Sequence, residues 1–166
     1  MTFDEGDLRF DFGTTTAIKF DEQSNFKLSH CMKAVDFILE TGSEYYFIEV
    51  KDPDDPISSE ENRESFREKL KSGELKKSLI TKFRDTFIYR WAEDSLNKPV
   101  RYIVLLCMNA LDERLLNNLS DGLRRDLPLN KAANWKQEIA HSCVILSLDR
   151  WNRHFKKWTV SRISNM

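Results

Sequence analysis

The chain lacks several features that identify common classes of protein. Its longest strongly apolar run, residues 102–108, falls far short of the roughly 20 residues that a membrane-spanning helix needs. The N-terminal residues hold no basic segment followed by an apolar one, as a secretory signal would. The three cysteines are odd in number and have no C-x-x-C spacing, which is typical of reduced thiols. We therefore expect a cytoplasmic protein that does not bind membranes.

Motifs of several well-known enzyme classes are also missing. The sequence holds no G-x-x-x-x-G-K-[ST], no G-x-G-x-x-G and no G-x-S-x-G, so nothing indicates a phosphate-binding glycine loop or a serine nucleophile at a strand–helix turn. The histidines, His30, His141 and His154, are scattered and lack the spacing of zinc ligands. No internal repeat is evident.

The composition predicts one globular domain that spans residues 1–166, because 40% of the residues are hydrophobic and 32% are charged. The net charge of −1 conceals an asymmetry. Residues 1–60 hold 14 acids against 5 Lys and Arg, whereas residues 61–166 hold 13 acids against 21. Such a split fits an acidic metal site that faces a basic nucleic-acid surface. It equally fits two halves that attract each other, and charge alone does not decide between them.

The clearest local feature is a predicted β-hairpin over residues 32–52, MKAVDFILETGSEYYFIEVKD. Two runs rich in β-branched and aromatic residues flank Gly42-Ser43, which suits a two-residue loop with glycine first. Such a loop pairs Thr41 with Glu44 and thereby sets the whole register. The expected pairs on the apolar face are Val35 with Val50, Phe37 with Ile48, and Leu39 with Tyr46.

The opposite face of this hairpin carries charge, because successive side chains alternate between faces. It places Asp36 opposite Glu49, with Lys51 on the same side. Two like charges in facing positions destabilise a strand pair by roughly 0.2–1 kcal/mol. A divalent cation between them would turn this repulsion into a net attraction. Carboxylate and carbonyl oxygens are the ligands that magnesium and manganese prefer. The alternative is a half-exposed hairpin with a charged outer face, although neighbouring Ile38 and Phe47 favour a covered one.

An acid on one strand of a hairpin, followed by Glu-Val-Lys on the next, resembles the PD-(D/E)XK (restriction endonuclease-like) nuclease superfamily. Here the match is Asp36 with Glu49-Val50-Lys51, and Val35 stands where the family name has proline. The resemblance implies that Asp36, Glu49 and the Val50 carbonyl bind Mg²⁺ or Mn²⁺, and that Lys51 acts on the attacking water. It also implies an N-terminal helix with a further acid, for which Glu22 is the best-placed candidate; an exposed surface glutamate is the other interpretation.

The resemblance implies hydrolysis of phosphodiester bonds in DNA or RNA, with nucleic acid as the partner. The alternative is a catalytically inactive protein of the same fold that acts as a nucleic-acid- or protein-binding module. The catalyst needs the metal and the module does not. A homodimer or a protein partner is compatible with either function.

The remaining patterns predict an α/β protein with a mixed central sheet and flanking helices. Alternation predicts strands over residues 8–12 and 17–20 that are joined by a turn, and residues 21–30 suit a short helix. Ser58 and Glu61 form a potential capping box for a helix towards Lys71, ended by Gly73. The other expected elements are a helix over residues 75–91, a strand over 100–108, a helix over 111–127, a short helix over 131–141 and a strand over 142–148.

Basic residues accompany aromatic ones in the last segment, residues 149–166. The cations of this tail, and those of the helix over residues 75–91, suit phosphate contacts. For the cations of the helix, however, solvated charge is the favoured interpretation. For the tail aromatics Trp151, Phe155 and Trp158 we favour a terminal helix that docks them on the sheet, because their spacing is helical.

Overall fold

The computed structural model describes residues 1–22, 31–109 and 113–165, which form two β-sheets and four α-helices. No helix in these ranges combines the length and the apolarity that crossing a membrane requires. The elements in chain order are β1 (Thr2–Glu5), β2 (Leu8–Asp11), β3 (Thr16–Lys19), β4 (Phe37–Glu40), β5 (Tyr45–Lys51), α1 (Glu60–Ser72), α2 (Glu74–Ala92), β6 (Val100–Leu106), α3 (Glu113–Asp126), β7 (Ser142–Leu146), α4 (Leu148–His154), β8 (Thr159–Arg162) and the 3₁₀ turn η1 (Ile163–Asn165).

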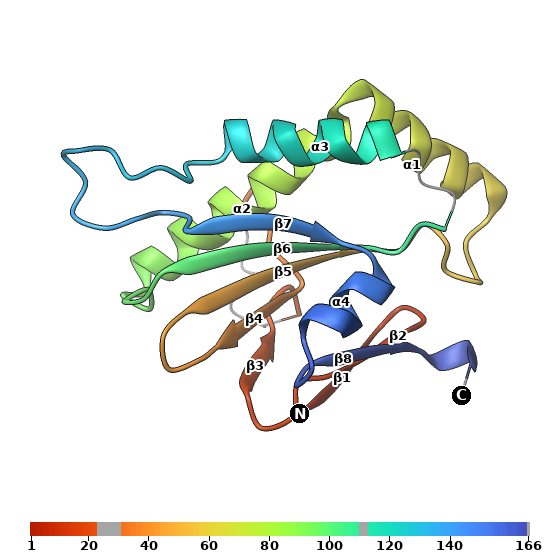
Figure 1. Ribbon diagram of the computed structural model, residues 1–166, viewed down its shortest axis with the longest axis horizontal. Helices are drawn as coiled ribbons and strands as arrows, with labels where there is room; N and C mark the ends of the chain where they lie inside the picture. Colours follow the sequence, from red (N-terminus) through yellow and green to blue (C-terminus); the bar gives the residue numbers. More distant parts are fainter. Residues whose placement is uncertain (23–30, 110–112, 166) are drawn as a thin grey trace.

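The larger sheet has five strands in the order β3-β4-β5-β6-β7. The pairs β3–β4 and β4–β5 are antiparallel, whereas β5–β6 and β6–β7 are parallel. Helices α1 and α2 connect β5 to β6, and α3 connects β6 to β7. Figure 1 shows these three helices on one face of the sheet, with α4 and the smaller sheet on the other. The predicted mixed α/β sheet with flanking helices is therefore present.

The predicted register of the β4–β5 hairpin is confirmed. Phe37 pairs with Ile48, and the Thr41 N–H donates to the Glu44 carbonyl at 3.0 Å across the two-residue loop. The ladder ends at Phe37, however, so the expected ladder pairs of Asp36 with Glu49 and of Val35 with Val50 are not formed. The Val35 N–H donates instead to Thr86 Oγ1 of α2 at 3.0 Å, which turns this segment away from β5 and towards the helix.

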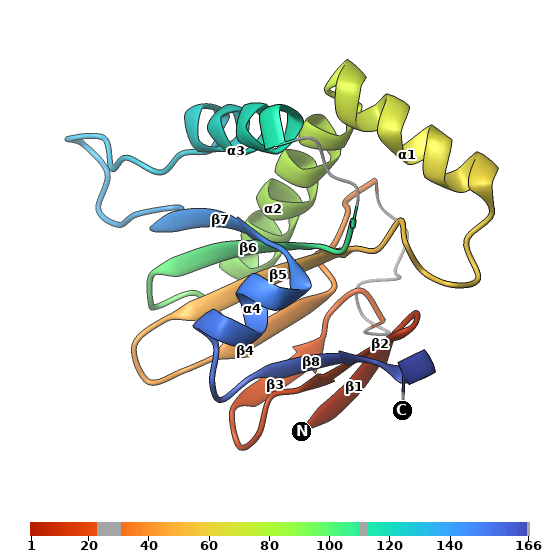
Figure 2. The same ribbon diagram turned by 45° about the vertical axis from the view of Figure 1, so that its right-hand side comes forward.

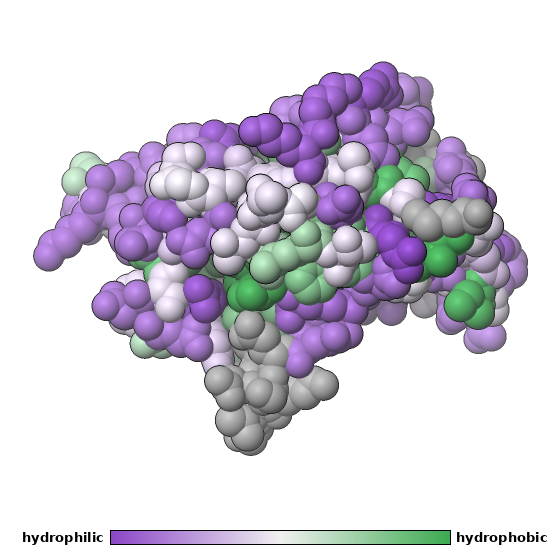
Figure 3. Space-filling model, turned by 90° about the horizontal axis from the view of Figure 1, so that it is seen from below, coloured by the Kyte–Doolittle hydropathy of each residue, from purple (hydrophilic) through white to green (hydrophobic). Residues whose placement is uncertain are grey.

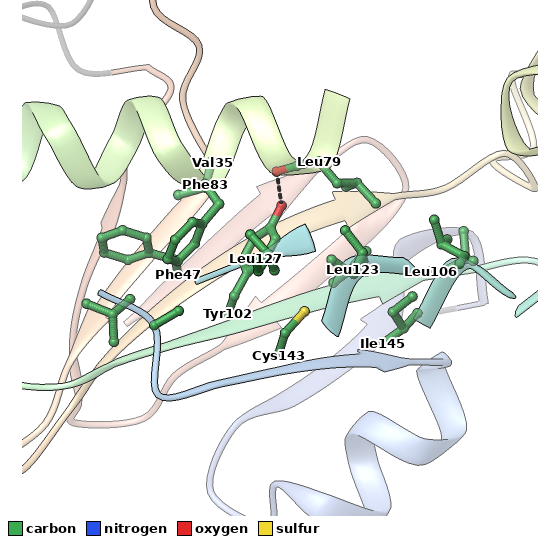
Figure 4. Close-up of a cluster of buried hydrophobic side chains, with 14 of the residues drawn as sticks. Val35, Phe47, Leu79, Phe83, Tyr102, Leu106, Leu123, Leu127, Cys143 and Ile145 are labelled. Atoms are coloured by element: carbon green, nitrogen blue, oxygen red, sulfur yellow. Dashed lines mark hydrogen bonds between the residues drawn. The ribbon is translucent and has the colours of Figure 1, made fainter. Parts of the chain in front are cut away.

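A large apolar core lies between the five-stranded sheet and its helices (Figure 4). Phe47 and Tyr102 rise from β5 and β6 to meet Leu79 and Phe83 of α2, and the Tyr102 hydroxyl donates to the Leu79 carbonyl at 3.0 Å. The predicted apolar stripe of α2 is buried over its first turns only. Trp91 near its end is 61% exposed.

A second apolar core fills the space between the five-stranded sheet and the small sheet with α4. The small sheet has the order β1-β2-β8, with all pairs antiparallel. The second core includes Phe10 of β2, Phe37 of β4 and Trp151 of α4, and all three are fully buried. Figure 2 shows β8 beside β2 and α4 above them. The outward face, seen from below in Figure 3, is mostly hydrophilic with small apolar patches, as expected for an antiparallel sheet with one solvated face.

This second sheet corrects two expectations. The strands over residues 8–12 and 17–20 do not pair with each other, because β2 joins β1 and β8 whereas β3 joins β4. The tail aromatics do pack on the large sheet as predicted, but α4 ends at His154, so Trp158 lies beyond the helix. Its indole N–H donates to Thr15 Oγ1 at 2.8 Å.

Smaller differences concern helix ends. Helix α1 has its N-cap at Ser59, whose side chain accepts from the Asn62 N–H, and not at Ser58. Gly73 ends α1 as predicted, with a φ of 80°, a left-handed conformation that favours glycine. Residues 131–141 form turns and not a helix. The helix expected over residues 21–30 lies largely outside the described residues.

We predict that Trp151→Phe lowers the free energy of unfolding by about 2 kcal/mol, because the smaller ring leaves a void and the indole N–H can no longer donate to the Trp158 carbonyl, now 2.9 Å away. Urea denaturation measures the change. Trp91→Phe is the matched control, and it should stay within about 0.5 kcal/mol of the wild type because the ring is largely exposed. Equal effects of the two substitutions would contradict this description of the second core.

Candidate carboxylate and lysine site

The structure brings Asp36 and Glu49 together on the helix-covered face of the large sheet. Asp36 is 5% exposed and Glu49 is fully buried. The Lys82 ammonium of α2 contacts both, at 2.7 Å from Glu49 Oε1 and 3.3 Å from Asp36 Oδ1. The two carboxylates are therefore neighbours within reach of a single cationic atom, on the side opposite to buried Phe37 and Ile48.

The position of Asp36 follows from the way its segment leaves the hairpin ladder. The Lys33 N–H donates to Asp85 Oδ2 at 3.0 Å, which ties this segment to α2. Asp36 Oδ2 accepts the Val50 N–H at 2.5 Å. The N–H and C=O of one strand residue point to the same side of the strand, so the Val50 carbonyl also points to the side of Asp36. This is the side on which the expected metal-binding carbonyl must lie.

Lys51 shares the face of Glu49, as the alternation of β5 predicts. Its ammonium lies 2.5 Å from Glu49 Oε1, and its side chain is 23% exposed. Glu49 Oε1 therefore accepts from two lysines, one on β5 and one on α2.

Asp21, and not Glu22, is the further acid near this site. The Glu22 carboxylate is 62% exposed and pairs with Lys19 at 2.7 Å. Asp21 is half-buried, and its Oδ1 atom is buried without a hydrogen-bond partner among the described residues. Its neighbour Phe20 donates a backbone N–H to the Asp36 carbonyl at 2.7 Å. The sequence signal for Asp21 was its position directly after Phe20, an apolar residue that is expected to face the core.

Lys82 is the other residue that the sequence did not single out. The charges of α2 were expected to be solvated, yet the Lys82 side chain is only 20% exposed. Its position is three residues after Leu79 and four before Thr86, both fully buried, so it lies on the edge of the buried helical stripe. That spacing is a signal that it faces the sheet, although it does not reveal the carboxylates opposite.

The charges of the cluster shift several pKa values upward. Burial, together with the nearby Asp36, raises the pKa of Glu49 from 4.5 to about 7, although both lysines oppose this. Burial and the Asp36 charge likewise raise the pKa of Asp21 to about 6. Burial alone would lower the pKa of Lys82, but Glu49 and Asp36 outweigh it and hold the pKa above its ordinary value. All three groups therefore hold protons more tightly than usual, Glu49 and Asp21 chiefly because they are buried and Lys82 because two carboxylates face it.

A hard divalent cation fits the donor set of this cluster. In the parts of the chain that the structure describes, no three His, Cys, Asp or Glu side chains form a group that could hold a metal. Two carboxylates and a carbonyl oxygen are nevertheless the ligand types that Mg²⁺ accepts alongside water. Glu49 Oε2 is buried without a hydrogen-bond partner among the described residues, which leaves one oxygen for such an ion.

Ion pairs between the two halves of the chain account for part of the charge asymmetry. Arg101 pairs with Glu44 at 2.7 Å, and Lys98 pairs with Glu40 at 2.6 Å. Arg162 of β8 pairs with Asp52 just after β5 at 2.8 Å. Asp52, which follows β5, therefore joins the end of the large sheet to β8 through this ion pair. Residues 1–60 and 61–166 therefore attract each other through these ion pairs, as one of the two interpretations of the charge asymmetry expects.

We predict that the unfolding free energy falls as the pH rises from 5 to 8. Between pH 4.5 and about 7, the raised pKa of Glu49 lets the folded protein hold a proton that the unfolded chain has released. The loss attributable to Glu49 is on the order of 2 kcal/mol, and Asp21 adds to it in the lower part of this range. Glu49→Gln removes the titrating group, so its unfolding free energy should not show this loss. Between pH 5 and 8 the stability of the variant should rise by this amount relative to that of the wild type.

Urea denaturation at the two pH values measures the difference, and the exposed Glu40→Gln of the same hairpin is the matched control. Parallel pH profiles for wild type and Glu49→Gln would show that Glu49 does not titrate as described.

Comparisons of the chain with protein-family models, with curated proteins and with solved structures gave no match. Nothing in them identifies the PD-(D/E)XK superfamily, so the resemblance noted for Asp36 and Glu49-Val50-Lys51 stays a prediction. The function must therefore be argued from the chemistry of the site.

Proposed function

We propose that this protein is a metal-dependent nuclease that hydrolyses phosphodiester bonds in DNA or RNA. The observation that carries the proposal is the buried pair of carboxylates, Asp36 and Glu49, with Lys51 on the same strand face. Burying two like charges costs free energy, so a chain keeps such a pair where a cation offsets the cost or a function requires the pair. Sites with strongly shifted pKa values next to specific charge partners are candidates for catalysis.

The order of the elements supports the same proposal. An antiparallel β3-β4-β5 meander is followed by helices and a strand, β6, parallel to β5. A hairpin that is followed by helices and a parallel crossover is what the restriction endonuclease-like resemblance implies. Fold alone does not establish function, so the topology adds weight to the site and does not replace it.

Each residue of the site has a distinct role in this proposal. Asp36, Glu49 and the Val50 carbonyl would hold Mg²⁺ or Mn²⁺. When bound, such an ion acidifies a coordinated water and neutralises charge on the scissile phosphate. Lys51 would orient the attacking water, since its amino group lies beside Glu49 and its side chain reaches solvent, and as the neutral amine it would accept a proton from that water. Lys82 holds the two carboxylates together and competes with the metal for their oxygens.

The alternative is a catalytically inactive fold that serves as a nucleic-acid- or protein-binding module. One observation favours it: Lys51 and Lys82 already supply two cations to the Asp36–Glu49 pair. Such a network can persist as a structural ion cluster without any metal. Metal binding separates the two functions, because only the nuclease requires it.

We predict that wild-type protein cleaves DNA or RNA with Mg²⁺ or Mn²⁺ and that Glu49→Gln abolishes cleavage and metal binding together. Lys51→Ala should bind the metal nearly as well and lose about 10²–10⁴-fold in rate, because its role is in proton transfer. Gel assays on labelled substrates measure cleavage, and Mn²⁺-dependent shifts of the melting temperature measure metal binding.

Glu40→Gln serves again as the control and should cleave like wild type. Cleavage that Glu49→Gln retains would show that Glu49 is a structural residue. Metal binding without cleavage of any substrate would favour the module.

We further predict that Lys82→Met raises the affinity for Mn²⁺ by roughly tenfold at pH 8, because the competing ammonium is removed while the stem that packs against the sheet is kept. Electron paramagnetic resonance of free Mn²⁺ measures the affinity directly. Lys76→Met, on the same helix but paired with Asp126, should leave it unchanged. Weaker binding by Lys82→Met would mean that this lysine supports the metal site and does not compete with it.

A further inference from the structure

A pocket of about 530 Å³ lies beside the carboxylate cluster and has no role in the function proposed so far. It is bounded by the two helices α1 and α2, which meet at the Gly73 turn (Figure 2), and by the end of β5. Lys51 lines this pocket and also contacts Glu49, so the pocket and the cluster are continuous. The lining residues are Lys33, Lys51, Phe66, Lys69, Glu74, Leu75, Lys77, Ser78 and Thr81. Its volume is within the range of ligand sites.

The lining carries uncompensated positive charge. Four lysines and one acid, Glu74, line the pocket, and one of the four, Lys51, is paired with Glu49. Within the described ranges, the ammonium groups of Lys33, Lys69 and Lys77 form no ion pair, in contrast to the paired lysines outside the pocket such as Lys98 on Glu40. Like charges that line one pocket without partners repel one another. The pocket is therefore an electrostatic site for an anion, and an anion would relieve that repulsion.

The uncharged lining residues indicate which anion fits. Ser78 and Thr81 bring hydroxyl groups, which donate hydrogen bonds to phosphate oxygens. Phe66 and Leu75 bring apolar surface, and an aromatic ring can stack on a nucleic-acid base. Lysine ammonium groups bind phosphate as point charges and do not need the planar, two-pronged contact that an arginine makes. A phosphate with an adjoining base uses all of these groups, whereas an acidic peptide would leave the ring without a planar partner.

We propose that this pocket binds a phosphate group of a nucleic-acid strand, with the neighbouring base on Phe66, directly next to the carboxylate cluster. The identity of the ligand rests on the proposed nuclease function, whereas the anion site itself rests on the lysines. The pocket holds the strand on one side of the cluster and so sets where the strand lies relative to Lys51.

The test compares two pairs of exposed lysines with equal charge. One variant is Lys69→Ala with Lys77→Ala in the pocket, and the control is Lys156→Ala with Lys157→Ala near the far sheet. Fluorescence anisotropy measures binding of a labelled single-stranded oligonucleotide of about 12 nucleotides, in EDTA so that no cleavage occurs. We expect the pocket variant to lose about tenfold or more in affinity and to lower the magnitude of the slope of log affinity against log salt by about 0.7, for one lost phosphate contact on a single strand. The control should change neither the affinity nor the slope, because α4 and β8, which flank these two lysines, lie on the face of the large sheet opposite to the helices, so the tail cations do not adjoin the pocket.

The oligonucleotide is tested with a 5′-phosphate, with a 3′-phosphate and with neither, which identifies the source of the bound phosphate. A loss confined to one phosphorylated end supports a terminal phosphate, and an equal loss for all three supports an internal one. Equal behaviour of the pocket and control variants overturns the proposal, and so does displacement of the oligonucleotide by polyglutamate at the same charge concentration. Melting curves confirm that both variants are folded.

The outcome is distinct from that of the nuclease proposal, because binding in EDTA does not depend on the metal. A pocket-specific loss with no cleavage by wild type would uphold the phosphate site and remove the nuclease. Cleavage by wild type with unaltered binding in the pocket variant would do the reverse.

Discussion

The burial of Asp36 beside Glu49 is the interaction on which the arrangement of this protein depends. Two carboxylates in an apolar interior require positive charge, and the chain supplies it from two directions, through Lys51 on β5 and Lys82 on α2. Helix α2 must therefore lie across β5 at a position where a lysine reaches both acids. Burial, more than the charge of Asp36, raises the pKa of Glu49, while the two carboxylates hold the pKa of Lys82 above its ordinary value.

The same helix fixes the backbone that presents Asp36. Thr86 and Asp85 of α2 accept the N–H groups of Val35 and Lys33, while the Tyr102 hydroxyl of β6 donates to Leu79. Helix α2 thus bonds to the segment before β4 and to β6, on either side of β5. Because these groups are buried, a shift of the helix would leave them unpaired at a cost of about 1–3 kcal/mol each. The geometry of the charged cluster is held by neutral hydrogen bonds around it.

Sequence patterns predict the parts of this structure that depend on local periodicity. The register of the hairpin follows from Gly42-Ser43 and from alternation, and the buried strand β6 follows from an almost unbroken apolar run. Lys82 and Asp21 were not predicted to join Glu49, because their distance from it depends on how α2 and β3 pack. The pairing of β8 with β2 joins segments about 150 residues apart, and no local pattern reports it. Residues 131–141 had helical composition but form turns, since tertiary contacts override a weak propensity.

The pairing of β2 with β8 also constrains how the chain acquires its structure. The underside of the large sheet, with Phe37 and Ile48, is covered by residues from both ends of the chain. A ribosome releases α4 and β8 after the five strands of the large sheet, so this apolar surface stays open while that sheet is already complete. Until Trp151 and Val160 emerge, the nascent protein presents a surface prone to aggregation. Closure of the second core is therefore a late step that requires the C-terminal residues, and a chain truncated before α4 would keep the helix-side core while exposing the other face of its sheet.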